Sequence, residues 1–126
     1  MEVAANNVIR IPTSQKKFFR FWFEFLKPFH KLTDREIDVI TAFTYERYNL
    51  GKVISDEDIL DKVVMSEDTK KKIREEYKVT PAYFQVIMGK LRRNGLIVNN
   101  KINPRFIPNI TEDNGLFKLM LLFDIQ

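Results

Sequence analysis

The sequence predicts a mostly helical α+β fold with a small antiparallel β-hairpin. Four segments begin with a helix-capping residue and continue with apolar residues at helical spacing. After the last of them, two short apolar runs separated by turn residues indicate the strands of a hairpin. The 126 residues suffice for one domain with a hydrophobic core. We divide them into an arm with an aromatic helix, residues 1–31, and a main domain, residues 32–126.

The first segment combines a short alternating run with a helix rich in aromatic residues. Residues 8–11 (VIRI) alternate as in a strand, which Pro12 ends, and they either add an edge to the hairpin sheet or form an arm. In the helix expected over residues 16–29, one aromatic stripe holds Phe18, Trp22, Phe25 and Phe29, and a second holds Phe19, Phe23 and Leu26.

Two such stripes present more apolar surface than one small core readily covers. Three roles are therefore open for this helix. It extends the core, it lies on a membrane surface through its apolar and basic residues, or it forms an oligomer or partner interface. The residues of that interface would be Phe18, Phe19, Trp22, Phe23, Phe25 and Phe29.

Three helices are expected next, at residues 33–49, 55–64 and 66–78. Thr33 and Glu36 have the spacing of a capping box, in which each side chain accepts from the other residue's backbone N–H. Ser55 and Ser66 are the expected caps of the other two helices, and acidic residues follow each of them, as the helix dipole favours. Residues 52–54 indicate a short strand between the first two helices.

The helix expected over residues 80–94 carries the candidate site. Thr80 suits the N-cap, Pro81 suits the first turn, and Gly95 suits a left-handed stop. The apolar face of this helix contains Phe84, Ile87, Met88 and Leu91. The opposite face is small, polar and basic, with Ala82, Gln85, Val86, Gly89 and Arg93, flanked by Lys90 and Arg92. Residues 96–98 then indicate a strand, paired across turns with a second strand over residues 116–125.

Charge is distributed unevenly along the chain, although the formal net charge is only +4. Residues 70–105 contain ten Lys or Arg against two Glu, a net +8, whereas residues 33–69 contain ten acidic residues against four basic ones, a net −6. This asymmetry favours one side that faces a polyanion. The alternative is that both sets lie on ordinary solvated helix faces.

The composition argues against an enzyme. The chain has no cysteine and one histidine, so a thiolate or histidine-rich metal site and a Cys/His dyad are not expected. We expect no cofactor and no small-molecule substrate. No signal peptide or membrane span is indicated, which favours the cytoplasm, or the host cytoplasm or virion for a phage protein.

The order of the elements resembles the winged helix-turn-helix superfamily of DNA-binding proteins. The run from Thr80 to Val98 is similar to its recognition helix and first wing strand, and NKINPRF at residues 100–106 is similar to a passage of plasmid and phage replication initiators. The resemblance covers residues 33–125, with an extra helix at 66–78 and the aromatic helix outside the minimal fold.

The resemblance implies that the N-terminal half of helix 80–94 enters the major groove of double-stranded DNA. Tyr83, Gln85 and Val86 would meet base edges, and Lys90, Arg92, Arg93, Lys101 and Arg105 would neutralise phosphates. The whole set implied for nucleic-acid binding is Thr80, Tyr83, Gln85, Val86, Lys90, Arg92, Arg93, Lys101, Asn103 and Arg105.

Two functions fit these observations. The first is a DNA-binding replication or transcription factor, encoded by a phage or another mobile element. The second is a virion or assembly protein, such as a head, neck or packaging component, that uses the same fold and oligomerises through the aromatic helix 16–29. The surplus of aromatic residues favours the second function, and the basic block around helix 80–94 favours the first.

Overall fold

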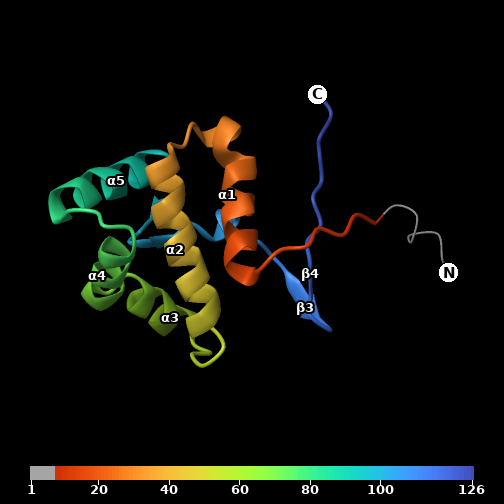
Figure 1. Ribbon diagram of the computed structural model, residues 1–126, viewed down its shortest axis with the longest axis horizontal. Helices are drawn as coiled ribbons and strands as arrows, with labels where there is room; N and C mark the ends of the chain where they lie inside the picture. The colour runs from red at the N-terminus through yellow and green to blue at the C-terminus, as the bar shows by residue number, and fades with distance from the viewer. Residues whose placement is uncertain (1–7) are drawn as a thin grey trace.

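Helix α2, Asp34–Leu50, is the element around which the fold is built. The computed structural model describes residues 8–126, and in it α2 packs against each of the other helices (Figure 1). These are α1, Gln15–His30, α3, Glu57–Val64, α4, Glu67–Glu76, and α5, Pro81–Arg93. The middle of α2 is buried on every side, with Ile37, Val39, Ile40 and Phe43 inaccessible to solvent. The fold is thus mostly helical, as the sequence predicted.

Local capping signals set the helix starts. The capping box between Thr33 and Glu36 is present, and the Ser66 hydroxyl accepts from the backbone N–H of Thr69. The expected cap at Ser55 is wrong by one residue. Asp56 is the cap of α3, and its carboxylate accepts from the backbone N–H of Ile59 at 3.1 Å. A carboxylate at this position also interacts favourably with the helix dipole.

Helix α5 matches its prediction most closely. Its buried residues are Phe84, Ile87, Met88 and Leu91, the four expected. Gly95 follows with a φ of +78°. The backbone N–H of Gly95 donates to Arg92 at 3.1 Å and that of Leu96 donates to Leu91 at 3.0 Å. These two bonds form a Schellman motif, which ends the helix and turns the chain into the following strand.

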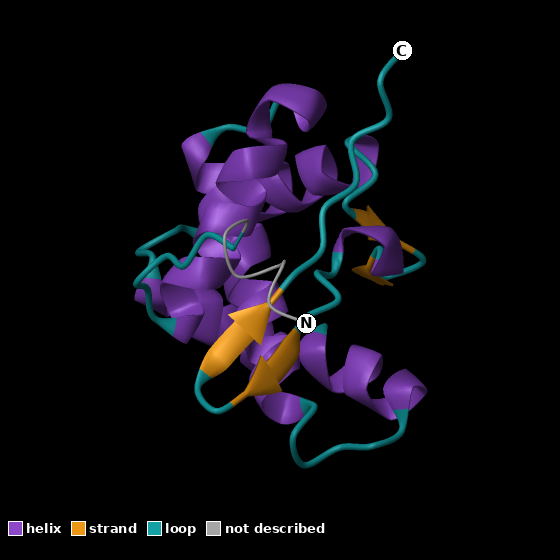
Figure 2. Ribbon diagram, turned by 90° about the vertical axis from the view of Figure 1, so that its right-hand side faces the viewer, coloured by secondary structure: helices purple, strands orange, loops and turns teal. Residues whose placement is uncertain are grey.

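The strands form two separate hairpins (Figure 2). Strand β1, Ile97–Val98, pairs with β2, Lys101–Ile102, and β3, Thr111–Asp113, pairs with β4, Leu116–Lys118. The expected pairing of residues 96–98 with a strand at 116–125 is therefore wrong. Asn99 and Asn100 both adopt positive φ, which closes a two-residue turn and gives β1 the nearest partner. A 3₁₀ turn, Pro104–Phe106, leads from β2 towards β3.

Two other expected strands are also absent from the described residues. Residues 52–54 continue the end of α2 as turns, with the backbone N–H of Val53 and of Ile54 both donating to Leu50, so they are not available to a sheet. Residues 8–11 are exposed and lack a ladder partner within residues 8–126.

The two aromatic stripes of α1 have different environments. Phe23 is buried in the core and Phe19 is buried against Tyr45, Tyr48 and Phe117, so the expectation that they belong to an open partner interface is wrong. Phe25 and Phe29 are exposed, and Phe18 and Trp22 are half-buried. The Trp22 Nε1–H donates to the Phe106 carbonyl at 2.7 Å. Helix α1 therefore extends the core with one stripe and presents part of the other to solvent. No helix within residues 8–126 combines the length and apolarity needed to cross a bilayer.

Candidate nucleic-acid interface

The N-terminal half of α5 presents an uncovered face. Tyr83 and Val86 are 45% and 50% exposed, and Gln85 is also exposed, on the far side of Val86 from Tyr83 around the helix. Thr80 is exposed but its hydroxyl accepts from the Tyr83 backbone N–H at 3.2 Å, so it acts here as the helix cap. This end of α5 lies at the outer edge of the molecule, while its other end lies against α2 (Figure 1). A neutral, partly apolar helix face is thus accessible to a partner.

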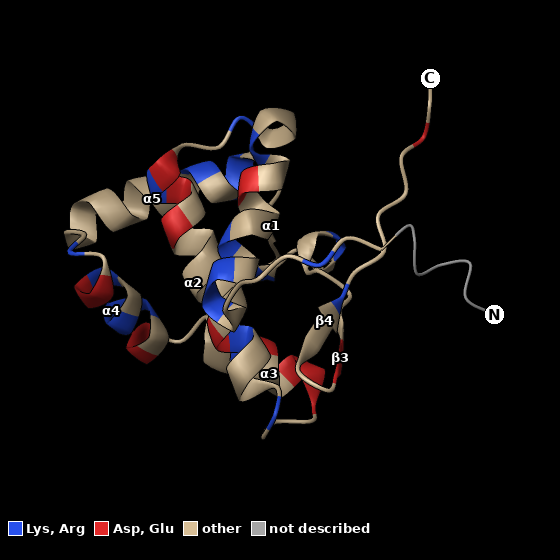
Figure 3. Cartoon of the chain, turned by 45° about the vertical axis from the view of Figure 1, so that its right-hand side comes forward, with Lys and Arg blue, Asp and Glu red and all other residues tan. Residues whose placement is uncertain are grey.

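The C-terminal half of α5 carries its positive charge. Arg92 and Arg93 are exposed and form no ion pair with any residue in the described part of the chain. The Arg93 guanidinium lies over Gly89, where an added Cβ would stand 3.6 Å from its Nη1. In Figure 3 the basic residues of α5 gather at the end near α2, and the end near α4 is uncharged. The apolar and basic parts of the face therefore follow one another along the helix axis.

A buried carboxylate joins this basic end to α2. Glu36 is only 3% exposed and accepts from the Thr33 hydroxyl at 2.8 Å and from the Asn94 amide at 3.3 Å. The Lys90 ammonium lies 3.9 Å from the same carboxylate. Lys90 thus has a partner inside the protein, unlike Arg92 and Arg93. Sequence reasoning assigned Glu36 to the capping box alone and missed its second role, because Asn94 is 58 residues away.

The residues after β1 do not all join the α5 face. Lys101 lies in β2, which packs on α3, and shares a shallow hollow with Asp58, Asp61 and Lys62. The Asn103 side chain is fully engaged in the fold, because its amide donates to the Gly95 carbonyl at 2.9 Å and its oxygen accepts from the Arg105 backbone N–H at 3.0 Å. The Arg105 residue itself is exposed.

Part of the positive block between residues 70 and 105 is neutralised or covered by the fold. The Lys72 ammonium lies 3.0 Å from Glu46, and that of Lys70 lies 3.8 Å from Glu67. The Arg74 guanidinium lies 5.4 Å from the centre of the Phe84 ring. Lys71 and Lys78 are exposed and form no ion pair within residues 8–126. Fewer basic side chains near α5 are therefore available to a partner than the net charge of residues 70–105 suggests.

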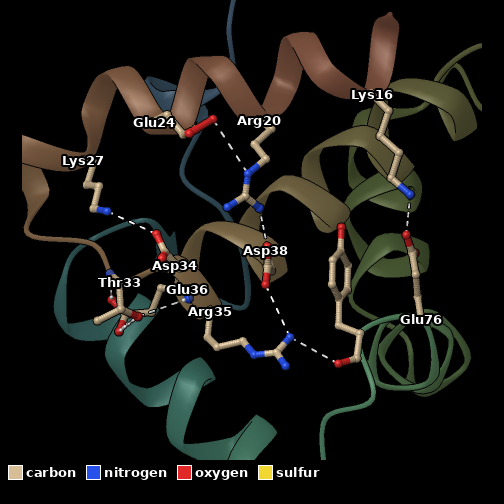
Figure 4. Close-up of polar contacts among 11 residues, drawn as sticks. Lys16, Arg20, Glu24, Lys27, Thr33, Asp34, Arg35, Glu36, Asp38 and Glu76 are labelled. Atoms are coloured by element: carbon tan, nitrogen blue, oxygen red, sulfur yellow. Dashed lines mark hydrogen bonds and ion pairs between the residues drawn. The ribbon is translucent and has the colours of Figure 1, made fainter.

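A network of ion pairs fixes α1 and α4 to α2 (Figure 4). Asp38 of α2 accepts from Arg20 of α1 and lies 3.4 Å from Arg35, whose guanidinium also donates to the Tyr77 carbonyl at 3.2 Å. Lys16 pairs with Glu76, and this hydrogen bond raises the pKa of the Lys16 ammonium. The network orients the helices that support α5 and makes no contact with its exposed face.

Within residues 8–126, no three His, Cys, Asp or Glu side chains come close enough to hold a metal ion. Asp61, which lines the hollow beside Lys101, is held by Arg47 at 2.9 Å. The exposed face of α5 is therefore the candidate site that the structure offers.

Comparison with known proteins adds no relative. No protein-family model matches the chain, and neither a curated protein nor a solved structure matches it.

Proposed function

We propose that this protein binds double-stranded DNA as a winged-helix protein of the replication- or transcription-factor type. The observation that carries the proposal is the exposed face of α5, with Tyr83, Gln85 and Val86 at the outer end and Arg92 and Arg93 beyond them. An α-helix fits the major groove, where base edges can be read by polar and apolar side chains. The order of α2, α3, α5 and the β1–β2 hairpin supports the winged-helix assignment, with α4 as an added helix.

Each residue of the face has a chemical role in this proposal. The Gln85 amide has one donor group and one acceptor, which match the adenine edge, and the Val86 methyl groups match the thymine methyl group. Tyr83 contributes an aromatic ring and a hydroxyl at the groove wall. Arg92 and Arg93 bind phosphates, which fixes the position of the helix without reading sequence.

The roles of the remaining candidates are narrower. Lys90 faces the buried Glu36 carboxylate, and we propose that it positions α5 more than it binds phosphate. Asn103 positions the chain after the hairpin through its bonds to Gly95 and Arg105. Lys101 and Arg105 are proposed as phosphate contacts of a DNA segment that extends beyond α5 towards the hairpin.

The test is a titration of the protein with duplex DNA at several salt concentrations. Each phosphate contact contributes about −0.9 to the slope of log K against log salt. The Arg92→Ala/Arg93→Ala variant should therefore bind more weakly, with a slope reduced by roughly two units. Both side chains are exposed and lack ion pairs within the described chain, so folding should be unaffected.

A matched control is Lys17→Ala/Lys52→Ala. It removes the same charge from exposed residues at the start of α1 and after α2, the end of the molecule opposite to α5 (Figure 1). The control should keep the wild-type slope. An equal loss of slope in both variants would mean that binding follows net charge alone, and an unchanged slope in the α5 variant would remove α5 from the interface.

Recognition of the DNA sequence by α5 is tested separately, by selecting binding sites from a pool of random DNA duplexes. Gln85→Ala should lose preference at one base pair by about 1–3 kcal/mol while keeping the salt slope. If the selected site is the same for the wild type and this variant, Gln85 reads no base.

The second candidate function is a virion or assembly protein. The observation that favours it is the amount of exposed apolar surface away from α5, on Phe25, Phe29 and residues 120–125. Large exposed apolar patches mark interaction surfaces. Suppose that the wild-type protein forms a large oligomer and that its affinity for duplex DNA is no higher than that of the Arg92→Ala/Arg93→Ala variant. That result would favour an assembly function over DNA binding.

A further inference from the structure

Residues 119–126 (LMLLFDIQ) form an extended segment whose apolar side chains are uncovered. The segment follows β4, and none of residues 120–126 forms a backbone hydrogen bond with the described part of the chain. Met120, Leu121 and Leu122 are 81%, 43% and 84% exposed. This alternation is that of a strand, with one face turned towards the protein and the other towards solvent. An extended apolar segment with unpaired backbone groups is a template for strand pairing.

The segment is continuous with the exposed aromatic residues of α1. The Phe123 ring lies 6.2 Å from the Phe25 ring, which lies 5.9 Å from the Phe29 ring. Within β4, the Phe117 ring lies 5.3 Å from the Phe18 ring. Phe123 therefore joins the segment to the exposed aromatic residues of α1. The exposed apolar residues of α1 and of the segment that lie here are Phe25, Phe29, Met120, Leu121, Leu122, Phe123 and Ile125.

The size of this surface matches a specific protein interface. The exposed fractions of its seven residues add up to nearly five fully exposed side chains. At roughly 150–200 Å² each, they offer about 700–900 Å², comparable to the ~800 Å² that each partner buries in a standard interface.

We propose that two copies of this chain pair through residues 118–124, antiparallel about a two-fold axis at Leu121. In this register Lys118 lies opposite Asp124 of the second copy at both ends, and the residues between them are apolar. Opposite charges across a strand pair stabilise it, and like charges destabilise it. A slip by one residue would place Lys118 opposite an apolar residue, so the charges select the register.

The groups needed for this pairing are accessible. The Lys118 ammonium lies 3.4 Å from Asp113 of its own hairpin, but both side chains are more than half exposed, so this ion pair holds Lys118 weakly. Met120 and Leu122 would face each other across the axis, and Leu121 would face its own copy. A second copy supplies both a strand for the backbone and apolar side chains for the surface. Two-fold pairing of this kind is the commonest form of homo-oligomer.

Cysteine scanning tests the register directly, because the natural sequence has no cysteine. In Leu121→Cys the two thiols lie opposite each other, at the Cβ separation of about 4.5–5.5 Å found for directly opposed residues and near that of a disulfide. This variant should form a covalent dimer on mild oxidation. Ile125→Cys is the matched control, on the same segment and more exposed than Leu121, 92% against 43%, but eight residues from its copy, about 27 Å along the strand.

Sedimentation of the natural chain and of Leu122→Asp completes the test. The wild type should sediment as a dimer, and Leu122→Asp should sediment as a folded monomer, because this side chain is exposed in the single chain and packs on the second copy. Asp124→Lys should weaken the dimer about tenfold by placing like charges together, and Lys118→Glu/Asp124→Lys should restore it.

The proposal fails if the wild type is monomeric at every concentration, or if its oligomer is unchanged in Leu122→Asp. Crosslinking of Ile125→Cys as fast as Leu121→Cys would also refute it, since that result indicates parallel or non-specific contact. None of these outcomes depends on DNA, so the proposal stands or falls separately from the DNA-binding function.

Discussion

The Glu36→Ala substitution tests how α5 is held on the core. The buried carboxylate accepts from the Thr33 hydroxyl at 2.8 Å and from the Asn94 amide at 3.3 Å. Removing it takes away the glutamate half of the capping box of α2, worth about 1 kcal/mol. It also removes the acceptor of the Thr33 hydroxyl and of the Asn94 amide, at about 0.5–1.5 kcal/mol each. We expect a loss of about 2–4 kcal/mol in the free energy of unfolding, a large part of the 5–15 kcal/mol typical of a domain. Urea unfolding followed by circular dichroism measures it.

Two variants separate the sources of this loss. Glu36→Gln keeps the shape and an acceptor oxygen, so the capping box and the Asn94 bond survive in part, and its loss should be about half that of Glu36→Ala. Glu67→Ala removes a first-turn glutamate of α4 that is largely exposed, and should cost less than about 0.5 kcal/mol. If Glu36→Ala is no more harmful than Glu67→Ala, the carboxylate does not join α2 to α5 and the reasoning is wrong.

Three further predictions concern local features of the fold. Lys78 has a φ of +53° at the end of α4, so Lys78→Gly should raise stability by about 1 kcal/mol in thermal unfolding, while Lys78→Ala should leave it unchanged. The Thr41 hydroxyl is buried without a partner among described residues, whereas that of Thr44 donates to Ile40; Thr41→Val should therefore stabilise and Thr44→Val should not. Burial and the hydrogen bond to Glu112 raise the pKa of Tyr48 from 10 to about 12. The protonated phenol therefore adds to the free energy of unfolding, fully below pH 10 and progressively less towards pH 12. Phenolate absorbance should show this late titration, and Tyr48→Phe should remove the part due to Tyr48 and leave that of Tyr77, whose pKa is also raised by burial.

The helix ends were predictable because their causes are local. A capping side chain acts on a backbone N–H three residues away, as at Thr33, Ser66 and Thr80. The apolar face of α5 was also predictable, since helical spacing alone places Phe84 and Leu91 together. The one-residue error at Ser55 arose because Asp56 is an equally good cap.

Strand pairing was less predictable because it depends on which partner lies nearest in space. The segment 96–98 has the composition of a strand, but the positive φ of Asn99 and Asn100 decided that residues 101–102 would pair with it. Residues 116–125 have an equally apolar composition, yet the structure pairs only Leu116–Lys118, because β3 begins at Thr111, which lies opposite Lys118. A strand needs a second strand, and composition cannot supply its position.

The sequence by itself determined the helical class of this protein, the start of most helices and the exposed face of α5, because these depend on residues within one or two helical turns. Only the tertiary structure decided that Phe19 and Phe23 are buried while Phe25 and Phe29 are exposed, since both stripes of α1 are aromatic and α2 covers one of them. It also decided that a capping glutamate of α2 would hold the end of α5. A buried carboxylate needs hydrogen-bond donors around it, and these donors come from segments that only folding brings together.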